Sequence, residues 1–545
     1  MTQGEIERLP EKIAGIFQEL EKRIMNDVVR RIRINGFSTA SADWQISRLQ
    51  QLGESEENIR SWVSEALTAT DKELDEIFSD AVYEEFMGHD RAYRVMGKHR
   101  IPYRDNLQLQ SLVEAIRRQT KGEFENITRT MAVGAKGADG RVILTPLMSF
   151  YRSTLDNAVM DIESGAFDYQ RVLMRTVKVL KASGIRSVTY EHGPSIRIEA
   201  GVRRAVLTGF RQVQEKINEQ TAAELGTDYY EVTYHVGARP THQPWQGRVW
   251  SWKDLHDVCG LGTVTGLHGA NCYHDYNAFI PGVSVRTYTD EQLDEMIAEE
   301  NTPKEYGDKE YTTYEALQEQ RRLERNARAT REEIMMLTEG GSDPDEIILA
   351  KARLQGILQV YNDFSDKMGL PTQYDRIYLD GLKGEFRLTE TEKTIYQQSK
   401  RDARFSERFI DYNNGQKDTI SIKNILNELN RSETGKEVAE YIFKHDELLI
   451  QMCYNMDNPS GILGDQFGSD IRIFASETKT VKRTTEVLIH EITHYRYDIG
   501  GSQWAECVCI AQERKHHERK AELTVSELRD IIKEVKELYP EYPWR

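Results

Sequence analysis

The chain has 545 residues, a formal charge of −17 at pH 7, 39% hydrophobic residues and 30% charged residues. One hydrophobic core rarely serves a chain of this length, so we expect about three domains. The composition predicts a predominantly helical α+β protein with several domains. No apolar run approaches the roughly 18 residues that a membrane span needs, which excludes an integral membrane protein.

The negative charge also argues against broad nucleic-acid binding, which depends on neutralising phosphates. A basic cluster at Arg30, Arg31 and Arg33 is expected to be a solvated helix face, so contact with nucleic acid would be only incidental. Cysteines are few and odd in number, which favours a reducing compartment over a disulfide framework. The first residues do not have the pattern of a conventional secretion signal.

Residues 1–135 read as an N-terminal helical module. We expect a break at Asn35-Gly36 and a new helix after Thr70, because Thr70-Asp71-Lys72-Glu73 matches a capping box. Large apolar residues at helical spacing predict buried stripes. They are Trp44, Leu49, Trp62, Leu67, Leu74 and Ile77. This module shows no chemistry of its own and is typical of a scaffold or docking part.

Residues 136–290 read as an α+β module. Gly134–Gly140 is rich in glycine but lacks the G-K-[ST] ending of a phosphate loop, so we expect a flexible turn there. Two short runs, Ser187–Tyr190 and Ser195–Ile198, predict a hairpin around Glu191–Pro194.

The same module contains a group of histidines and cysteines. His268, Cys272 and His274 fall within seven residues of sequence, and His242, His256 or Cys259 could complete a second, structural metal site. The spacing is irregular and has no C-x-x-C pair, so hydrogen-bonded imidazoles in a loop-rich core remain the alternative. Cys272 could also act as a nucleophile with His274, although no third orienting group is evident.

Four motifs in this region carry a resemblance to a known family. They are Gly237–His242, Trp245–Arg248, Gly269–His274 and Phe279–Ser284. They resemble the minor capsid protein 2 family of phages, which is related to Mu F-type head morphogenesis proteins, and the resemblance covers most of residues 1–380. This chain has Cys-Tyr-His at 272–274, where Cys-Arg-His or Cys-Arg-Cys is expected.

The resemblance implies a virion structural protein, present in few copies near the portal vertex. Its expected partners are the phage portal and major capsid proteins, and it would be assembled in the cytoplasm of the bacterial host. Residues 291–380 fit this picture as a helical hairpin or linker. Thr312–Glu315 forms a capping box there, and Gly340–Pro344 separates two helices.

A metal-binding motif lies in the last part of the chain, residues 385–545. Val487–Glu506 contains the pattern H-E-x-x-H. Residues four apart share a helix face, so His490 and His494 can hold one Zn²⁺ ion, with Glu491 as general base. A catalytic zinc usually has three protein ligands, and Glu506 is the predicted third.

The flanking residues support a helical setting for this motif. Thr484 or Thr485 is expected to cap the motif helix, Gly500-Gly501 to end it, and Ser502 to cap the next helix. That second helix would bring Glu506 to the metal, with Glu513 as the alternative ligand.

Upstream, Asp470–Ser476 alternates like a strand. The order of strand, motif helix, turn and glutamate-bearing helix resembles the gluzincin branch of zinc metallopeptidases. In that branch the strand edges the cleft and binds an extended substrate. Tyr495, Arg496 and Tyr497 are candidate oxyanion donors, and His516-His517 is expected at the surface.

We therefore predict a phage or prophage minor capsid protein with a C-terminal zinc metallopeptidase domain that acts on a peptide or protein. Two alternatives stay open. The C-terminal domain could be an effector that the virion delivers into a host cell, or an inactive zincin fold with a purely structural role.

Overall fold

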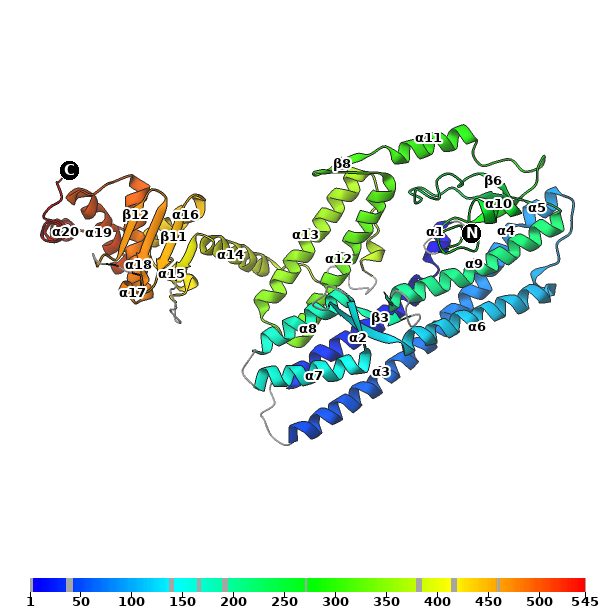
Figure 1. Ribbon diagram of the computed structural model, residues 1–545, viewed down its shortest axis with the longest axis horizontal. Helices are drawn as coiled ribbons and strands as arrows, with labels where there is room; N and C mark the ends of the chain where they lie inside the picture. The colour runs from blue at the N-terminus through cyan, green and yellow to red at the C-terminus, as the bar shows by residue number, and fades with distance from the viewer. Residues whose placement is uncertain are drawn as a thin grey trace. The chain divides into compact units, whose positions relative to one another are not determined.

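A computed structural model describes residues 3–35, 43–136, 142–163, 168–188, 195–269, 272–378, 385–412, 419–456, 458 and 461–544. The chain forms two compact units, unit 1 (Met1–Leu388) and unit 2 (Thr389–Arg545), each with its own hydrophobic core. The predicted fold class is confirmed, since the protein is multidomain, α+β and mostly helical (Figure 1). The boundaries predicted within residues 1–380 stay predictions. No described helix is long and apolar enough to cross a membrane.

Long helices dominate unit 1. Its α-helices are α1 (Gln3–Arg8), α2 (Glu11–Asn35), α3 (Asp43–Glu76), α4 (Val82–Gly88), α5 (Asp90–Val95), α6 (Leu107–Arg129), α7 (Leu147–Glu163), α8 (Tyr169–Ser183), α9 (Ile198–Leu225), α10 (Trp252–Asp257), α11 (Asp290–Asn301), α12 (Thr313–Gly340) and α13 (Pro344–Met368). Figure 1 shows α2, α3, α6 and α9 packed side by side. Their apolar stripes meet in one core, where each fully buried Leu, Ile, Val or Phe contributes roughly 1.5–3 kcal/mol.

The predicted helix start after Thr70 is wrong. Helix α3 runs without a break past this residue and continues through a π-helical turn, Ile77–Ala81, into α4. The Thr70 hydroxyl donates a hydrogen bond to the carbonyl of Leu67 (2.8 Å), so it is satisfied inside the helix and caps nothing. The stripe prediction is confirmed for Leu74 and Ile77, which are buried. Trp44 and Leu49 lie outside the described side chains.

The described residues of unit 1 also form three small antiparallel sheets. Their strands are β1 (Met131–Lys136), β2 (Val142–Pro146), β3 (Ile185–Val188), β4 (Ser195–Arg197), β5 (Tyr229–Val232), β6 (Val249–Ser251), β7 (Tyr276–Phe279), β8 (Lys304–Tyr306) and β9 (Lys309–Tyr311), ordered β2-β1-β3-β4, β6-β5-β7 and β8-β9. The pairing of β3 with β4 confirms the predicted hairpin strands. Their expected turn, Glu191–Pro194, lies outside the described residues. Strand β1 takes up the start of the glycine-rich segment, and residues 137–141 are not described.

The hairpin of α12 and α13 packs into the core of unit 1. Thr312 forms the predicted capping box, and α12 ends at Gly340 before Gly341 adopts a left-handed conformation (φ 67°). Asp343 then caps α13, with Pro344 as its first residue. Leu337, Tyr361 and Phe364 are among the hairpin residues that belong to the same core as α2.

The basic residues Arg30, Arg31 and Arg33 of α2 interact with groups of neighbouring helices. Arg30 pairs with Glu339 (2.7 Å), and Arg33 donates to the backbone carbonyl of Glu339 (3.3 Å). Arg31 is buried and pairs with Glu54 (3.0 Å). The prediction of a solvated face is therefore wrong for Arg31, because the cluster ties α2 to its neighbours α3 and α12.

Unit 2 is built around one mixed sheet. Its elements are α14 (Glu390–Ser406), β10 (Phe409–Tyr412), α15 (Ile422–Leu429), α16 (Glu433–Lys444), β11 (Leu449–Cys453), β12 (Gly464–Phe467), β13 (Asp470–Phe474), α17 (Ala475–Thr478), α18 (Val481–Tyr497), α19 (Gln503–Glu518) and α20 (Val525–Leu538). The strand order is β10-β11-β13-β12, in which β12 alone is antiparallel to its neighbour. Ile450, Ile471 and Ile473 of the sheet share a core with Leu488 and Ile492 of α18.

Candidate functional site

Helix α18 carries the H-E-x-x-H motif. Its cap is Thr480, whose side chain accepts a hydrogen bond from the Arg483 backbone (3.2 Å). The predicted caps Thr484 and Thr485 are wrong, because both lie buried inside the helix. The helix ends at Tyr497, before the predicted glycines, since Asp498 takes the left-handed conformation (φ 49°) that Asp tolerates better than most residues.

The two motif histidines and Glu506 meet at one point. The Nε2 atoms of His490 and His494 lie 3.1 Å apart. Glu506 Oε2 lies 3.4 Å from His490 Nε2, and Glu506 Oε1 lies 3.5 Å from His494 Nε2. Zinc bonds of about 2.05 Å in a tetrahedron give edges of about 3.3 Å between ligand atoms. The two nitrogens stand near this separation, and each lies at a similar distance from one oxygen of the Glu506 carboxylate, so the three groups are close enough to share one zinc ion. Ser502 caps α19 as predicted, and this places Glu506 in the first turn of that helix.

The Nδ1 atoms of both histidines form hydrogen bonds with acceptors outside the group of His490, His494 and Glu506. His490 Nδ1 donates to Glu513 (2.6 Å), and His494 Nδ1 donates to the Ile499 carbonyl (2.9 Å). In the neutral rings both Nε2 atoms then offer lone pairs toward Glu506. Among the described residues, the buried Glu506 Oε2 accepts no hydrogen bond. This convergence of acceptors fits a divalent cation. Glu513 contacts the far side of the His490 ring, so it orients a ligand.

The charges of the group agree with this arrangement. Burial would lower the pKa of His490, but Glu506 and Glu513 outweigh it and raise the pKa to about 10. Burial would raise the pKa of Glu506, but the two imidazoles lower it to about 2. The structure thus holds a carboxylate against two imidazoles that can exchange their protons for a metal.

Glu491 lies beside the edge of the sheet. It is buried, and burial raises its pKa to about 7. Its carboxylate rests against β12, where a Cβ atom added to Gly464 would lie 2.9 Å from Glu491 Oε1. The predicted strand exists as β13, but it lies between β11 and β12. The strand at the edge next to the motif helix is therefore β12, which corrects the expectation for Asp470–Ser476.

Two residues near the candidate metal ligands were missed by sequence reasoning. The sulfur of Cys509 lies within 4.8 Å of ligand atoms of His490 and His494. Its place three residues after Glu506 on one helix was the available signal. Tyr539, just past α20, has a raised pKa caused by burial and by nearby Glu506. No sequence spacing connects it to the motif.

The three predicted oxyanion donors have partners elsewhere. Tyr495 donates to Glu447 (3.3 Å), and Arg496 donates to Glu437 (3.3 Å) on α16. Tyr497 is 48% exposed. Tyr495 and Arg496 are thus engaged with carboxylates outside the candidate metal group, and none of these observations supports the expected role.

The expected surface pair His516-His517 is only half right. His517 is exposed and pairs with Glu486 (2.7 Å). His516 is buried, and its Nδ1 lies 2.6 Å from the Ser432 hydroxyl. It therefore joins α19 to the start of α16.

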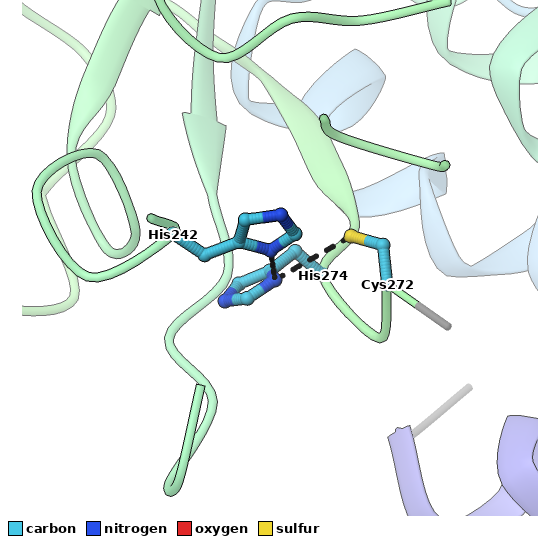
Figure 2. A group of neighbouring side chains, drawn as sticks. All are labelled: His242, Cys272 and His274. Atoms are coloured by element: carbon cyan, nitrogen blue, oxygen red, sulfur yellow. Dashed lines mark hydrogen bonds between the residues drawn. The ribbon is translucent and has the colours of Figure 1, made fainter. Parts of the chain in front are cut away.

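In unit 1 the structure brings together three of the four candidate ligands. His242, Cys272 and His274 are buried and adjacent (Figure 2). His268 lies apart from them, with its Nε2 3.3 Å from Asp275 Oδ1. Burial lowers the pKa of His274 to about 2 and raises the pKa of the Cys272 thiol. A buried thiol with a raised pKa is a poor nucleophile, which opposes the nucleophilic alternative.

The described part of unit 1 consists of long packed helices and small sheets, an architecture that suits a structural protein. The family model of phage minor capsid protein 2 matches residues 1–364, which is more than half of the chain. The chain belongs to this family, and it is a structural phage protein that associates with other proteins of the virion. No curated protein and no solved structure matches it. The H-E-x-x-H motif lies beyond the matched residues.

Proposed function

We propose that this minor capsid protein carries a zinc-dependent peptidase in unit 2. His490, His494 and Glu506 would hold the metal, and Glu491 would act as the general base. The observation that carries the proposal is the meeting of two imidazole nitrogens and the Glu506 carboxylate within 3.1–3.5 Å of one another, next to the buried carboxylate of Glu491.

The residues divide the chemistry between them. A bound zinc ion would act as a Lewis acid and make a water molecule easier to deprotonate. Glu491 takes the proton of the attacking water and passes it to the leaving amine. A pKa near 7 suits both transfers at neutral pH. Glu513 and the Ile499 carbonyl keep both imidazoles in the tautomer that leaves Nε2 free.

The edge strand supports a peptide or protein substrate. Strand β12 pairs with β13 on one side only, so its other edge offers backbone donors and acceptors to an added strand. Phe467 at the end of β12 is 85% exposed and offers an apolar contact. Because Gly464 of the same strand touches Glu491, a peptide bound along β12 would reach the general base.

The site of action would be the phage particle. We propose the portal and major capsid proteins as partners of unit 1, because the family match covers almost all of this unit. Crosslinking of assembled particles followed by mass spectrometry tests this proposal. Crosslinks from unit 1 to portal or major capsid peptides support it, and crosslinks confined to other virion proteins contradict it.

Full-length wild-type protein and Glu491→Gln test the peptidase. Both should bind zinc equally, because the ligands are intact. Hydrolysis of a mixed peptide library should fall by about 10²–10⁴-fold in the variant. Equal hydrolysis by both proteins contradicts the mechanism. Zinc binding without hydrolysis by either protein would favour the inactive, structural alternative.

A second candidate is an effector delivered by the virion. The observation that favours it is that unit 2 is a compact body lying outside the family match. Expression of the full chain in bacteria, with and without Glu491→Gln, tests it. Growth arrest only with the intact glutamate supports an effector, and unimpaired growth in both cultures contradicts it.

A further inference from the structure

A second histidine cluster joins two loops of unit 1. His242 lies between β5 and β6, and Cys272 and His274 directly precede β7. All three side chains are at most 2% exposed. Trp245 packs against both imidazoles, with ring centroids 4.5 Å from His242 and 4.8 Å from His274. The cluster is therefore closed by an aromatic wall and belongs to the interior of the module.

Hydrogen bonds determine which nitrogen of each ring carries its proton. His242 Nε2 lies 2.8 Å from the Thr265 carbonyl, which can only accept. His274 Nε2 lies 2.8 Å from Gln246 Oε1. That atom is an oxygen, because it also accepts the backbone N–H of His235 (3.0 Å). Both Nε2 atoms are thus donors, and both Nδ1 atoms of the neutral rings have free lone pairs.

The two free nitrogens face each other. His242 Nδ1 and His274 Nδ1 are 3.4 Å apart, and Cys272 Sγ lies 3.5 Å from His274 Nδ1 (Figure 2). Two acceptors at this distance repel unless something positive lies between them. The single S–H of Cys272 can satisfy one nitrogen but not both. In the alternative tautomer of His242 the proton is on Nδ1, and the Nε2 lone pair then faces the Thr265 carbonyl oxygen. The repulsion between two acceptors would therefore remain, at Nε2 in place of Nδ1.

The two separations from His274 Nδ1 match the edges of a tetrahedral zinc site, and ligand atoms of His242 and Cys272 lie within 4.8 Å of each other. Bonds of about 2.05 Å to nitrogen and about 2.3 Å to sulfur give edges of about 3.3 Å between nitrogens and about 3.6 Å between nitrogen and sulfur. The Thr265 carbonyl and the Gln246 amide then act as outer partners that orient the ligands, as in known zinc sites.

We propose that His242 Nδ1, His274 Nδ1 and Cys272 Sγ bind a structural zinc ion in unit 1. Imidazole and thiolate donors select zinc over magnesium or calcium, which prefer oxygen. Three donors meet among the described residues, which leaves one tetrahedral position for water or another ligand. The ion would pin the segment 258–275, whose described residues form neither helix nor strand, to the turn after β5.

The full-length chain with His490→Ala and His494→Ala tests this site without the unit 2 site. We expect about one zinc per chain by elemental analysis. After replacement by Co²⁺ we expect a sulfur-to-cobalt charge-transfer band in the near ultraviolet. Adding Cys272→Ser should abolish the band. Cys259→Ser, which removes another buried cysteine of the same core, should keep it, and so should His268→Asn.

Each result decides the proposal. The proposal is overturned if the folded chain with His490→Ala and His494→Ala binds no metal, or if it binds Co²⁺ without the charge-transfer band. This outcome does not depend on whether the Cys272→Ser variant folds. A band that persists in folded Cys272→Ser also overturns it. Circular dichroism establishes folding of each variant. Loss of the band in Cys272→Ser alone, with metal retained in both control variants, supports the site.

Discussion

The two histidine clusters have similar separations between their facing nitrogens but different surroundings. In each cluster, each imidazole ring has one nitrogen hydrogen-bonded to an acceptor. The remaining nitrogens of the two rings face each other, at 3.1 Å in unit 2 and at 3.4 Å in unit 1. Each cluster has a cysteine nearby, but the unit 2 cluster adds the carboxylates of Glu491, Glu506 and Glu513 and an edge strand, whereas the unit 1 cluster adds a tryptophan wall. The comparison teaches that ligand geometry defines a metal site, while the neighbouring groups define whether it can do chemistry.

The largest expected difference comes from removing each metal in turn. His490→Ala with His494→Ala should lower peptide hydrolysis by more than about 10³-fold, because both the metal and its water are lost. Cys272→Ser should leave hydrolysis unchanged. It should lower the free energy of unfolding by about 3 kcal/mol, the effect of a ligand at about 100 times its Kd. Peptide assays and urea denaturation measure the two effects. Hydrolysis that depends on Cys272 would break the comparison.

The contact between β12 and Glu491 offers a second test. In Gly464→Ala the new methyl group would meet Glu491 Oε1 at 2.9 Å and Val487 Cγ1 at 2.7 Å, so the carboxylate must shift. Hydrolysis should fall by up to about 10²-fold, with zinc content unchanged. Gly500→Ala is the matched control, because no atom lies within 4 Å of its added methyl group. Equal rates in both variants would show that β12 does not position the base.

The outer partner of His490 should have a smaller effect. In Glu513→Gln the amide oxygen can still accept from His490 Nδ1, but the negative charge is gone. Zinc affinity should fall by about 10–100-fold, and competition with a chromophoric chelator measures it. Glu518→Gln on the same helix is the control. Unchanged affinity in Glu513→Gln would mean that the carboxylate does not tune the ligand.

The smallest expected effect is an opposite pH dependence in the metal-free protein. The pKa of His490 is raised to about 10, so its contribution is present below about pH 6.5 and is lost as pH rises toward 10. The pKa of His274 is lowered to about 2, so its contribution is present above about pH 6.5 and is lost as pH falls. Each trend is at most about 1.4 kcal/mol per pH unit.

Hydrogen exchange measured by mass spectrometry separates the two trends by peptide. Peptides around His490 should open more easily at pH 8.5 than at pH 7.5, and peptides around His274 more easily at pH 5.5 than at pH 6.5. Saturating zinc should suppress the first trend. Parallel trends in both regions would contradict the assigned protonation states.

Local sequence patterns predicted much of the helical fold. The capping residues Thr312 and Ser502 and the break at Gly340–Pro344 act within one turn of the backbone, so short windows of sequence reveal them. The family resemblance, based on motifs in the middle of unit 1, is confirmed by the match over residues 1–364.

The sequence-based predictions failed where the local structure depends on residues that are distant in the sequence. Thr70 looks like a cap, but packing buries it inside α3. Asp470–Ser476 reads as a strand, yet only strand pairing makes β12 the edge. Tyr539 lies near Glu506 although 33 residues separate them, because the chain returns past α20.

The sequence by itself determined the helical class, the family and the donor types available for metal. His490 and His494 share a helix face because of helical periodicity alone. Only the tertiary structure decided that Glu506 faces both rings, that Glu513 lies behind one of them, and that Cys272 joins His242 while His268 does not. The physical reason is that ligand angles, tautomers and burial depend on groups that come from separate elements and meet only after folding.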